Sequence, residues 1–306
     1  MSPKELLFCY AGSKWRMAKR YNRLYPPHKH FVDVFGGTGA VIARKPKSRY
    51  ETYNDRDKAV YNVFSVIQDE AQRLELIRLL ENTPNSVEQY AVCKRIALDP
   101  AESDARRAWA FLVRGAVGFS GHPLIANSWT SIHKQRRRLL TLPDIVLGWR
   151  ERFRWVALEN RPWQEMLDRY DSPSTFFFCD PSYLPETLRC PVDHYYVHTL
   201  SREEHIELIE RLRTIQGYAL LCGYNHPAYT TRLFHWRKVS FQARSCMGAT
   251  KREKRQEQVW MNYEDDGSRI EGNRLRIARR YIDIMGGEEE AIRYLERVAQ
   301  LRRLPK

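Results

Sequence analysis

A short apolar strand that ends in a glycine turn constrains the fold of this chain most. The run Phe31–Phe35 is rich in β-branched and aromatic residues, stops at Gly36–Gly39, and is followed by the helix-compatible segment Ala40–Ala43. Strand, glycine turn and helix in this order open a parallel α/β unit. Glycines also let backbone N–H groups approach a ligand at the helix N-terminus. An ordinary turn without a ligand has the same pattern, so the motif alone predicts only the fold.

Strand-like and helix-like segments alternate along the rest of the chain. Apolar residues between Val60 and Ile67 recur at the spacing of one helix face, and Ser201 with Glu204 has the capping-box pattern of a helix start. Further strands are expected at 50–53, 153–158, 175–179, 218–222, 236–241 and 258–261. We therefore predict an α/β catalytic domain in two parts, 1–68 and 151–263, around a mostly helical insert, 69–150. Residues 264–306 are expected to form a basic helical tail.

The charge of the chain favours a polyanionic partner. There are 51 Lys and Arg residues against 37 Asp and Glu residues, a formal charge of +14. A large positive balance on a folded chain is typical of nucleic-acid binding, although many basic proteins bind none. Apolar residues make up 43% of the chain, enough to form a hydrophobic core. This composition excludes an intrinsically disordered tail. A mean hydropathy of −0.61 and the lack of any run near the ~20 apolar residues of a membrane span exclude a membrane protein.

Cysteine and histidine spacing gives little support to a metal site. None of the six cysteines forms a C-x-x-C pair, so we interpret them as reduced thiols and expect a cytoplasmic protein without a secretion signal. His194 and His198 are four residues apart, but Pro191 favours a loop there and no further ligands cluster nearby. Since a zinc site needs three or four ligands, we predict no metal.

The segment Asp180–Tyr183, with the sequence Asp-Pro-Ser-Tyr, is the sharpest chemical signal. Asp, Pro and Ser are also common in turns, so the segment could be an ordinary surface loop. It follows the fully apolar strand Thr175–Cys179, however, and ligands bind at the carboxyl ends of strands in α/β sheets. A carboxylate and a proline carbonyl there can accept the two hydrogens of a planar amine while the tyrosine stacks on its ring.

The glycine turn does not complete the NAD-binding fingerprint. Gly37 and Gly39 match its first two glycines, but Ile42 stands where the third belongs, which argues against a nicotinamide oxidoreductase. Asp55 comes 16 residues after Gly39, near the end of the next predicted strand. An acid there typically holds ribose hydroxyls, although a helix-capping aspartate is an equally good interpretation of Asp55 alone.

Three segments resemble the motifs of one enzyme family and occur in its order. Tyr10–Lys14 resembles the N-terminal cofactor segment, Asp33–Gly39 the main cofactor loop, and Asp180–Tyr183 the catalytic D-P-P-Y motif. The chain thus resembles the adenine-specific (N6) DNA methyltransferases that use S-adenosylmethionine, in the group that includes the GATC-methylating enzymes. Matching residues extend from about 8 to 263 and include the segment Tyr196–His205.

The resemblance implies a Rossmann-like methyltransferase sheet with a mostly helical target-recognition insert, S-adenosylmethionine as cofactor and double-stranded DNA as partner. The target adenine, buried in the duplex, would be flipped out to react. The implied cofactor residues are Tyr10, Lys14, Asp33, Phe35, Gly37, Asp55 and Asp180, with Asp55 on the ribose and Asp33, Phe35 and Gly37 around the methionine. The implied catalytic residues are Asp180, Pro181 and Tyr183.

Two positions depart from the family pattern. Ser182 replaces the second proline, which in the family pattern stiffens the turn and does not contact the base, so we expect activity to survive. A looser loop with a lower rate, or an inactive relative, is the alternative. Asn160 stands where related sequences often have an acid. A cytosine-C5 enzyme is rejected because its nucleophile needs a Pro-Cys sequence and the chain has only Cys190-Pro191. RNA adenine and cytosine N4 remain alternative targets.

Two basic runs are candidates for phosphate contacts or base readout. The run in the insert, which we predict to bind nucleic acid, consists of Lys134, Arg136, Arg137 and Arg138. A second run near the last strand consists of Lys251, Arg252, Lys254 and Arg255. A solvated surface is the competing interpretation for each residue.

Overall fold

A computed structural model describes residues 3–9, 12–119, 123, 128–129, 133–188, 197–244 and 254–264, with the single residues 267, 287, 289, 292 and 293. Within these residues, one seven-stranded sheet has the order β5-β2-β1-β6-β7-β9-β8. Its strands are β1 (His30–Asp33), β2 (Tyr50–Asn54), β5 (Ala157–Glu159), β6 (Thr175–Cys179), β7 (Tyr218–Tyr224), β8 (Arg237–Arg244) and β9 (Lys254–Met261). The first five strands in this order run parallel, and β9 is antiparallel to both of its neighbours.

The strand order reverses between β1 and β6, and this reversal positions the site. From β1 the chain proceeds outward to β2, whereas β6 pairs with the other side of β1, His30 opposite Thr175. Loops that leave the carboxyl ends of β1 and β6 therefore diverge and open a crevice, which is where ligands bind in open α/β sheets. The predicted Rossmann-like α/β sheet is confirmed.

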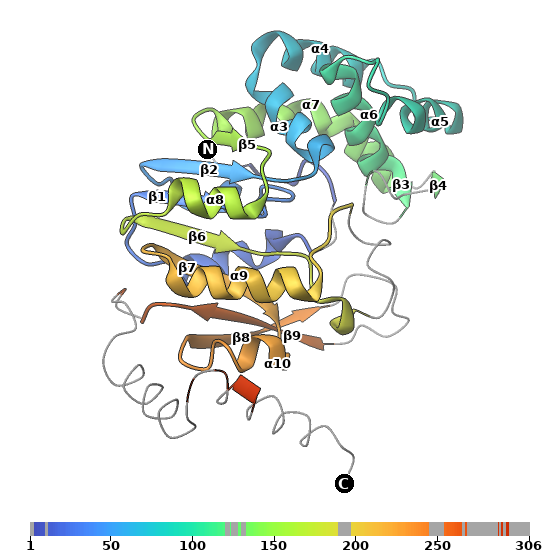
Figure 1. Cartoon of the computed structure of the whole chain (residues 1–306). Helices are drawn as coiled ribbons and strands as arrows, with labels where there is room; N and C mark the ends of the chain where they lie inside the picture. Colours follow the sequence, from blue (N-terminus) through green and yellow to red (C-terminus); the bar gives the residue numbers. More distant parts are fainter. Residues whose placement is uncertain are drawn as a thin grey trace.

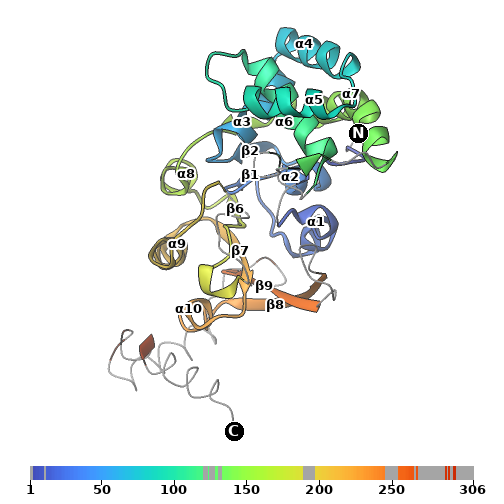
Figure 2. The same ribbon diagram turned by 90° about the vertical axis from the view of Figure 1, so that its right-hand side faces the viewer.

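Alternating side chains of the central strands build two cores, one on each face of the sheet. On one face Val32, Phe177 and Leu221 pack beneath α8 (Trp163–Tyr170), α9 (Arg202–Thr214) and α10 (Pro227–Thr230). On the other face Phe31 and Phe178 pack with α2 (Ala40–Arg44) and Tyr21 of α1 (Ala18–Tyr21). Figure 2 shows the sheet nearly edge-on between these two groups of helices. The continuous apolar pattern of β6 results from burial on both faces.

Five helices form a group beyond the β5–β2 edge of the sheet (Figure 1). They are α3 (Lys58–Gln68), α4 (Glu70–Glu81), α5 (Val87–Ile96), α6 (Asp104–Val117) and α7 (His133–Phe153). Helix α6 contacts each of the other four. The group shares a core with the sheet, because Phe64 of α3 stacks on Phe153 of α7 and lies against Tyr53 of β2.

A buried ion pair also joins α7 to the sheet. Glu51 of β2 accepts two hydrogen bonds from the Arg152 guanidinium, at 2.6 and 2.9 Å, and a third from Lys45 at 2.5 Å. All three side chains are nearly inaccessible. Removing one partner would leave a buried charge without compensation, so the three residues fix where α7 ends relative to β2.

Two local predictions differ from the structure. The strand expected at 153–158 is confined to β5, and Phe153 instead ends α7, which therefore continues past the boundary predicted at 150. The reason is the helical spacing of the buried residues Val146, Trp149 and Phe153, which the strand interpretation overlooked. The described part also contains a short antiparallel pair that was not predicted, β3 (Gly118–Phe119) with β4 (Ser128–Trp129). No described helix is long and apolar enough to span a bilayer.

Candidate active site

The glycine turn after β1 is held rigidly against the sheet. Gly37 and Gly39 have φ angles of +50° and +65°, which favour glycine. A side chain on Gly36 would overlap the ring of Tyr53, whose hydroxyl donates a 2.6 Å hydrogen bond to the carbonyl of Gly37. Gly39 precedes α2 directly, so the turn presents its backbone at a helix start. This geometry leaves one side of the turn open to a ligand.

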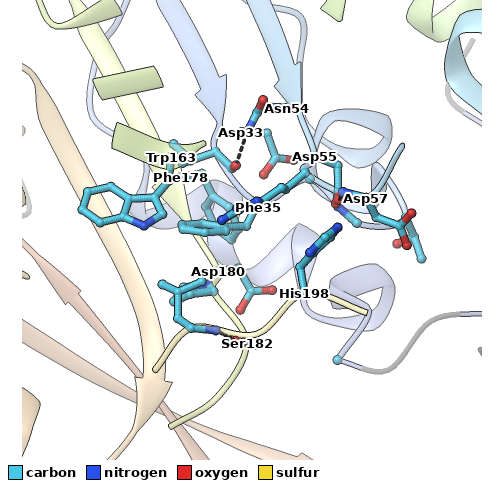
Figure 3. A pocket seen from close by; sticks show the side chains of 18 of the residues that line it. Asp33, Phe35, Asn54, Asp55, Asp57, Trp163, Phe178, Asp180, Ser182 and His198 are labelled. Carbon is cyan, nitrogen blue, oxygen red and sulfur yellow. Dashed lines mark hydrogen bonds between the residues drawn. The ribbon is translucent and has the colours of Figure 1, made fainter. Parts of the chain in front are cut away.

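A cavity of about 430 Å³ lies at the carboxyl ends of β1, β2 and β6. It brings together most of the predicted site residues, namely Lys14, Asp33, Phe35, Gly37, Asp55, Asp180, Pro181 and Tyr183. Asp33, Asp55 and Asp180 lie around it in Figure 3, with the Phe35 ring between them. Tyr10 lies outside the described residues. The cavity therefore joins the segments that follow three different strands.

Asp33 is a buried carboxylate without a partner in the described structure. The residue is 1% exposed, and neither carboxylate oxygen has a hydrogen-bond donor. Burial and then the nearby carboxylates of Asp180 and Asp55 raise its pKa well above the ordinary value. An unpaired acid inside an apolar site is costly unless a ligand supplies a donor or a positive charge. Asp33 thus points to a cationic or hydrogen-donating ligand.

Asp55 is tied to the glycine turn. Its Oδ2 accepts from the backbone N–H of Gly37 at 2.7 Å, and its Oδ1 accepts from the N–H of Asp57 at 2.8 Å. Burial and the Asp57 carboxylate raise its pKa to about 7, although both backbone hydrogen bonds oppose the rise. Each oxygen keeps a lone pair for a further donor. The arrangement suits a vicinal pair of hydroxyls.

Lys14 connects the N-terminal segment to the Asp-Pro-Ser-Tyr loop. It belongs to the short helix η1 (Lys14–Arg16), and its Nζ lies 2.7 Å from Oδ1 of Asp180 and 3.0 Å from Oε1 of Glu257. Burial lowers the pKa of Lys14, but the two carboxylates outweigh it and hold that pKa well above its ordinary value. The pKa of Asp180 is raised to about 6, mainly by burial. The Lys14 ammonium lowers this pKa, and the Glu257 carboxylate raises it.

Potential metal-ligand atoms of Asp180, Cys222 and Glu257 lie within 4.8 Å of one another. The Lys14 ammonium contacts both of these carboxylates. The chain itself therefore supplies one positive charge to this cluster.

Ser182 makes a contact that a proline could not make. Its Oγ accepts a 2.9 Å hydrogen bond from the backbone N–H of Leu200. Leu200 directly precedes α9, whose start is held by the capping box of Ser201 and Glu204. The loop of Asp180 is thereby fastened to the N-terminus of α9.

Tyr183 stacks on a neighbouring ring in this structure. Its ring lies 4.2 Å from that of Tyr224 at an angle of 21°, and Lys14 Nζ lies 5.2 Å from its centre. One face of Tyr183 is thus covered by Tyr224. A base would stack on its other face or contact its edge.

Two residues at the site, Trp163 and Glu257, were not singled out from the sequence, whereas His198 was considered there as a possible metal ligand and as part of the segment Tyr196–His205. Trp163 and His198 line the cavity, and the buried indole N–H of Trp163 has no partner among the described atoms. Trp163 follows β5, so the rule that ligands bind at carboxyl ends of strands could have found it. Glu257 lies on the antiparallel strand β9, where that rule gives no signal.

Asn160 has a supporting position. Its side-chain nitrogen donates to the backbone carbonyls of Asp55, at 2.7 Å, and Arg56, at 3.1 Å. It therefore holds the loop after β2, and it is not among the residues that line the main cavity.

The basic run of the insert lies at the start of α7. Arg137 is exposed, whereas Arg138 donates to the carbonyl of Leu6 at 2.5 Å and pairs with Glu5 at 3.6 Å. Arg138 is thus used to hold the N-terminal segment. The side chains of Lys134 and Arg136 lie outside what the structure describes, as do Lys251 and Arg252, while Lys254 and Arg255 begin β9.

Comparisons with known proteins identify one family. The family model described as D12 class N6 adenine-specific DNA methyltransferase matches residues 10–236. The matched range includes both the glycine turn and the Asp-Pro-Ser-Tyr loop. A search of curated proteins finds no match.

Proposed function

Because the chain belongs to the D12 class of N6 adenine-specific DNA methyltransferases, we propose that it takes its methyl group from S-adenosylmethionine. It delivers that group to an adenine that is flipped out of a specific duplex DNA sequence. The observation that carries this proposal is the convergence of the unpartnered Asp33 and the loop of Asp180 on one cavity. Its acidic lining suits a cationic cofactor next to an amine.

The residues of the cavity match the functional groups of S-adenosylmethionine. Its ammonium group would pair with Asp33, which has no other partner among the described residues. Its ribose hydroxyls would donate to Asp55, and its adenine ring would lie near the aromatic rings of Phe35 and Trp163. Bound there, the cofactor supplies a methyl group activated by a sulfonium.

The target amine would be held by the loop after β6. The lone pair of N6 is delocalised into the adenine ring, which makes this amine a poor nucleophile. Asp180 and the carbonyl of Pro181 would each accept one of its hydrogens, favouring a pyramidal nitrogen and stabilising its developing positive charge. Positioning supplies much of the remaining rate enhancement. Since the amine is inaccessible inside a duplex, we infer that the adenine is extruded and stacks beside Tyr183.

The helical insert is our candidate for target recognition. It lies beyond the β5–β2 edge of the sheet (Figure 1) and contributes the exposed Arg137. Lys134 and Arg136 belong to the same turn of α7 and are expected to share the contact with phosphates or bases. Arg138 is the weakest candidate of the four because Glu5 and Leu6 already engage it.

The proposal is tested by sequencing DNA from cells that express the protein, using a method that reports methylated adenine. We expect N6-methyladenine at one recurring sequence, and none with Asp180→Ala. Asp168→Ala is the matched control, because Asp168 is an exposed acid of α8 that pairs with Arg211 and is not among the residues that line the cavity. Full activity of Asp180→Ala would contradict the proposed site. Methylated RNA, methylated cytosine N4, or cofactor binding without any turnover would contradict the proposed reaction.

A further inference from the structure

Glu257 is a buried acid that none of the sequence motifs includes. It lies on β9 and is 3% exposed, and the family match ends before it, at residue 236. Strand β9 runs antiparallel to β7, with Glu257 opposite Tyr224. An antiparallel strand begins where its parallel neighbours end, so this register brings the side chain to the carboxyl ends of β6 and β7.

Glu257 contacts two residues of the Asp180 cluster. Its Oε1 lies 3.0 Å from Nζ of Lys14 and accepts a 3.4 Å hydrogen bond from the hydroxyl of Tyr183. The same Nζ also lies within hydrogen-bond distance of Asp180, of the carbonyl of Gly12 and of the Tyr183 hydroxyl. One ammonium is therefore shared between two carboxylates, of which Glu257 is 3% exposed and Asp180, which lines the cavity, is 16% exposed.

We propose that Glu257 is a positioning residue for methyl transfer: it draws the Lys14 ammonium partly away from Asp180 and so leaves the Asp180 carboxylate able to accept a hydrogen of the target amine. This inference rests on the proposed function. If Lys14 paired with Asp180 alone, the ammonium would neutralise the charge of the Asp180 carboxylate. That carboxylate would then be a weak hydrogen-bond acceptor for the target amine.

The chemistry of the step shows why the charge on Asp180 matters. The lone pair of N6 forms the new nitrogen–carbon bond, the carbon–sulfur bond breaks, and its electron pair stays with sulfur. The nitrogen then carries one surplus proton, which Asp180 accepts and passes to water. A carboxylate that is too well neutralised is a poorer acceptor for this proton.

Several elements bring titratable groups to Asp180. Lys14 comes from η1, Glu257 from β9, Asp33 from β1, Cys222 from β7, Tyr21 from α1, Tyr229 from α10, and Tyr183 and Cys179 from the same segment as Asp180. Glu257 raises the pKa of Asp180, whereas Lys14 lowers it. Removing the charge of Glu257 therefore lowers the pKa of Asp180.

The first test is the pH dependence of kcat in Glu257→Gln. We expect the acidic limb to move to a pH lower by about 1, because Asp180 ionises more easily, and the plateau value of kcat to fall about tenfold. Glu257→Asp keeps the charge at a longer distance from Lys14 and should give a smaller change in the same direction. Ser240→Ala is the control, since the Ser240 hydroxyl of β8 donates to the Gln258 side chain of β9 and has no described contact with Lys14, Asp180 or Glu257. Its profile should match the wild type.

The second test needs no methyl transfer. Aspartate labelled with ¹³C at the side-chain carboxyl reports the titration of Asp180 by NMR in the protein without cofactor, and Asp180→Asn assigns the signal. We expect the titration to move to lower pH in Glu257→Gln and less in Glu257→Asp. An unchanged Asp180 titration in both variants overturns the proposal about Glu257, even if the enzyme methylates DNA. A shifted titration in a protein that transfers no methyl group would instead place the failure in the proposed function.

Discussion

The hydroxyl oxygen of Ser182 lies 2.9 Å from the backbone nitrogen of Leu200 and accepts its hydrogen bond. The family pattern has a proline at this position, which stiffens the loop through its own ring. In this chain the stiffness comes instead from a bond to a second segment, the start of α9. The Ser182 hydroxyl thus adds an attachment to α9, beside the contact of Lys14 with Asp180 in the same loop.

Ser182→Ala tests this attachment. Because Leu200 would lose its acceptor in a nearly buried place, we expect the free energy of unfolding to fall by about 1 kcal/mol. We also expect kcat to fall about tenfold or more, since the loop that holds the amine becomes less well placed. Chemical denaturation and single-turnover methylation measure the two effects. Ser182→Thr keeps the hydroxyl and should stay close to the wild type; equal rates in all three proteins would show that the bond has no role.

Asp33→Asn should stabilise the protein and weaken its cofactor site. A raised pKa in the folded state means that Asp33 takes up protons on folding, so its unfavourable contribution grows as pH rises above the unfolded value of about 4. At neutral pH the neutral amide should therefore raise the free energy of unfolding by about 1 kcal/mol or more. The affinity for S-adenosylmethionine should fall at least about tenfold. Thermal unfolding against pH and calorimetric binding give both numbers.

The control for this prediction is Asp69→Asn, in which asparagine still caps α4. It should leave both quantities unchanged. A less stable Asp33→Asn protein with normal cofactor affinity would contradict the interpretation of Asp33.

Cofactor affinity should depend on pH through Asp55. Its pKa is raised to about 7, so the carboxyl group becomes protonated as pH falls through that value and accepts ribose hydroxyls less well. The dissociation constant of S-adenosylmethionine should therefore increase between pH 8 and pH 6. Calorimetric titrations across this range measure the change, and Asp55→Asn should bind weakly with a flatter pH profile. A profile that persists unchanged in Asp55→Asn would assign the effect to another group.

Two glycine substitutions should have opposite effects. Gly39 has a φ angle of +65°, and a Cβ there would lie 2.8 Å from the ring of Phe153 and 3.0 Å from that of Phe64. Gly39→Ala should therefore destabilise the protein by about 2 kcal/mol or more. Gly148 lies inside α7 with open space around it, so Gly148→Ala should stabilise by about 0.5–1 kcal/mol. Denaturant unfolding of both variants provides the comparison, and a stability loss in Gly148→Ala would contradict it.

The sequence predicts the sheet and the cavity well because both follow from local signals. The apolar strand β6 and the glycine turn after β1 each mark a place where a parallel strand ends, and such ends meet at one edge. The pairing of Lys14 with Glu257 has no local signal, since it depends on the register of β7 and β9. The role of Arg138 was missed for a similar reason. Its partners Glu5 and Leu6 lie far away in sequence, and a basic run looks the same whether it faces DNA or holds the chain.

The shared core of the helical group and the sheet restricts which parts of this chain can be exchanged with those of a relative. Arg152, near the end of the helical group, is paired with Glu51 of β2, and Phe153 fills the space behind Gly39. A hybrid enzyme that takes helices α4–α7 from a relative would also replace Phe153, the α7 residue that packs next to Gly39 of the glycine turn. If these helices recognise the target as proposed, a new sequence specificity obtained in this way would come with an altered glycine turn, unless both sides of this contact were inherited together.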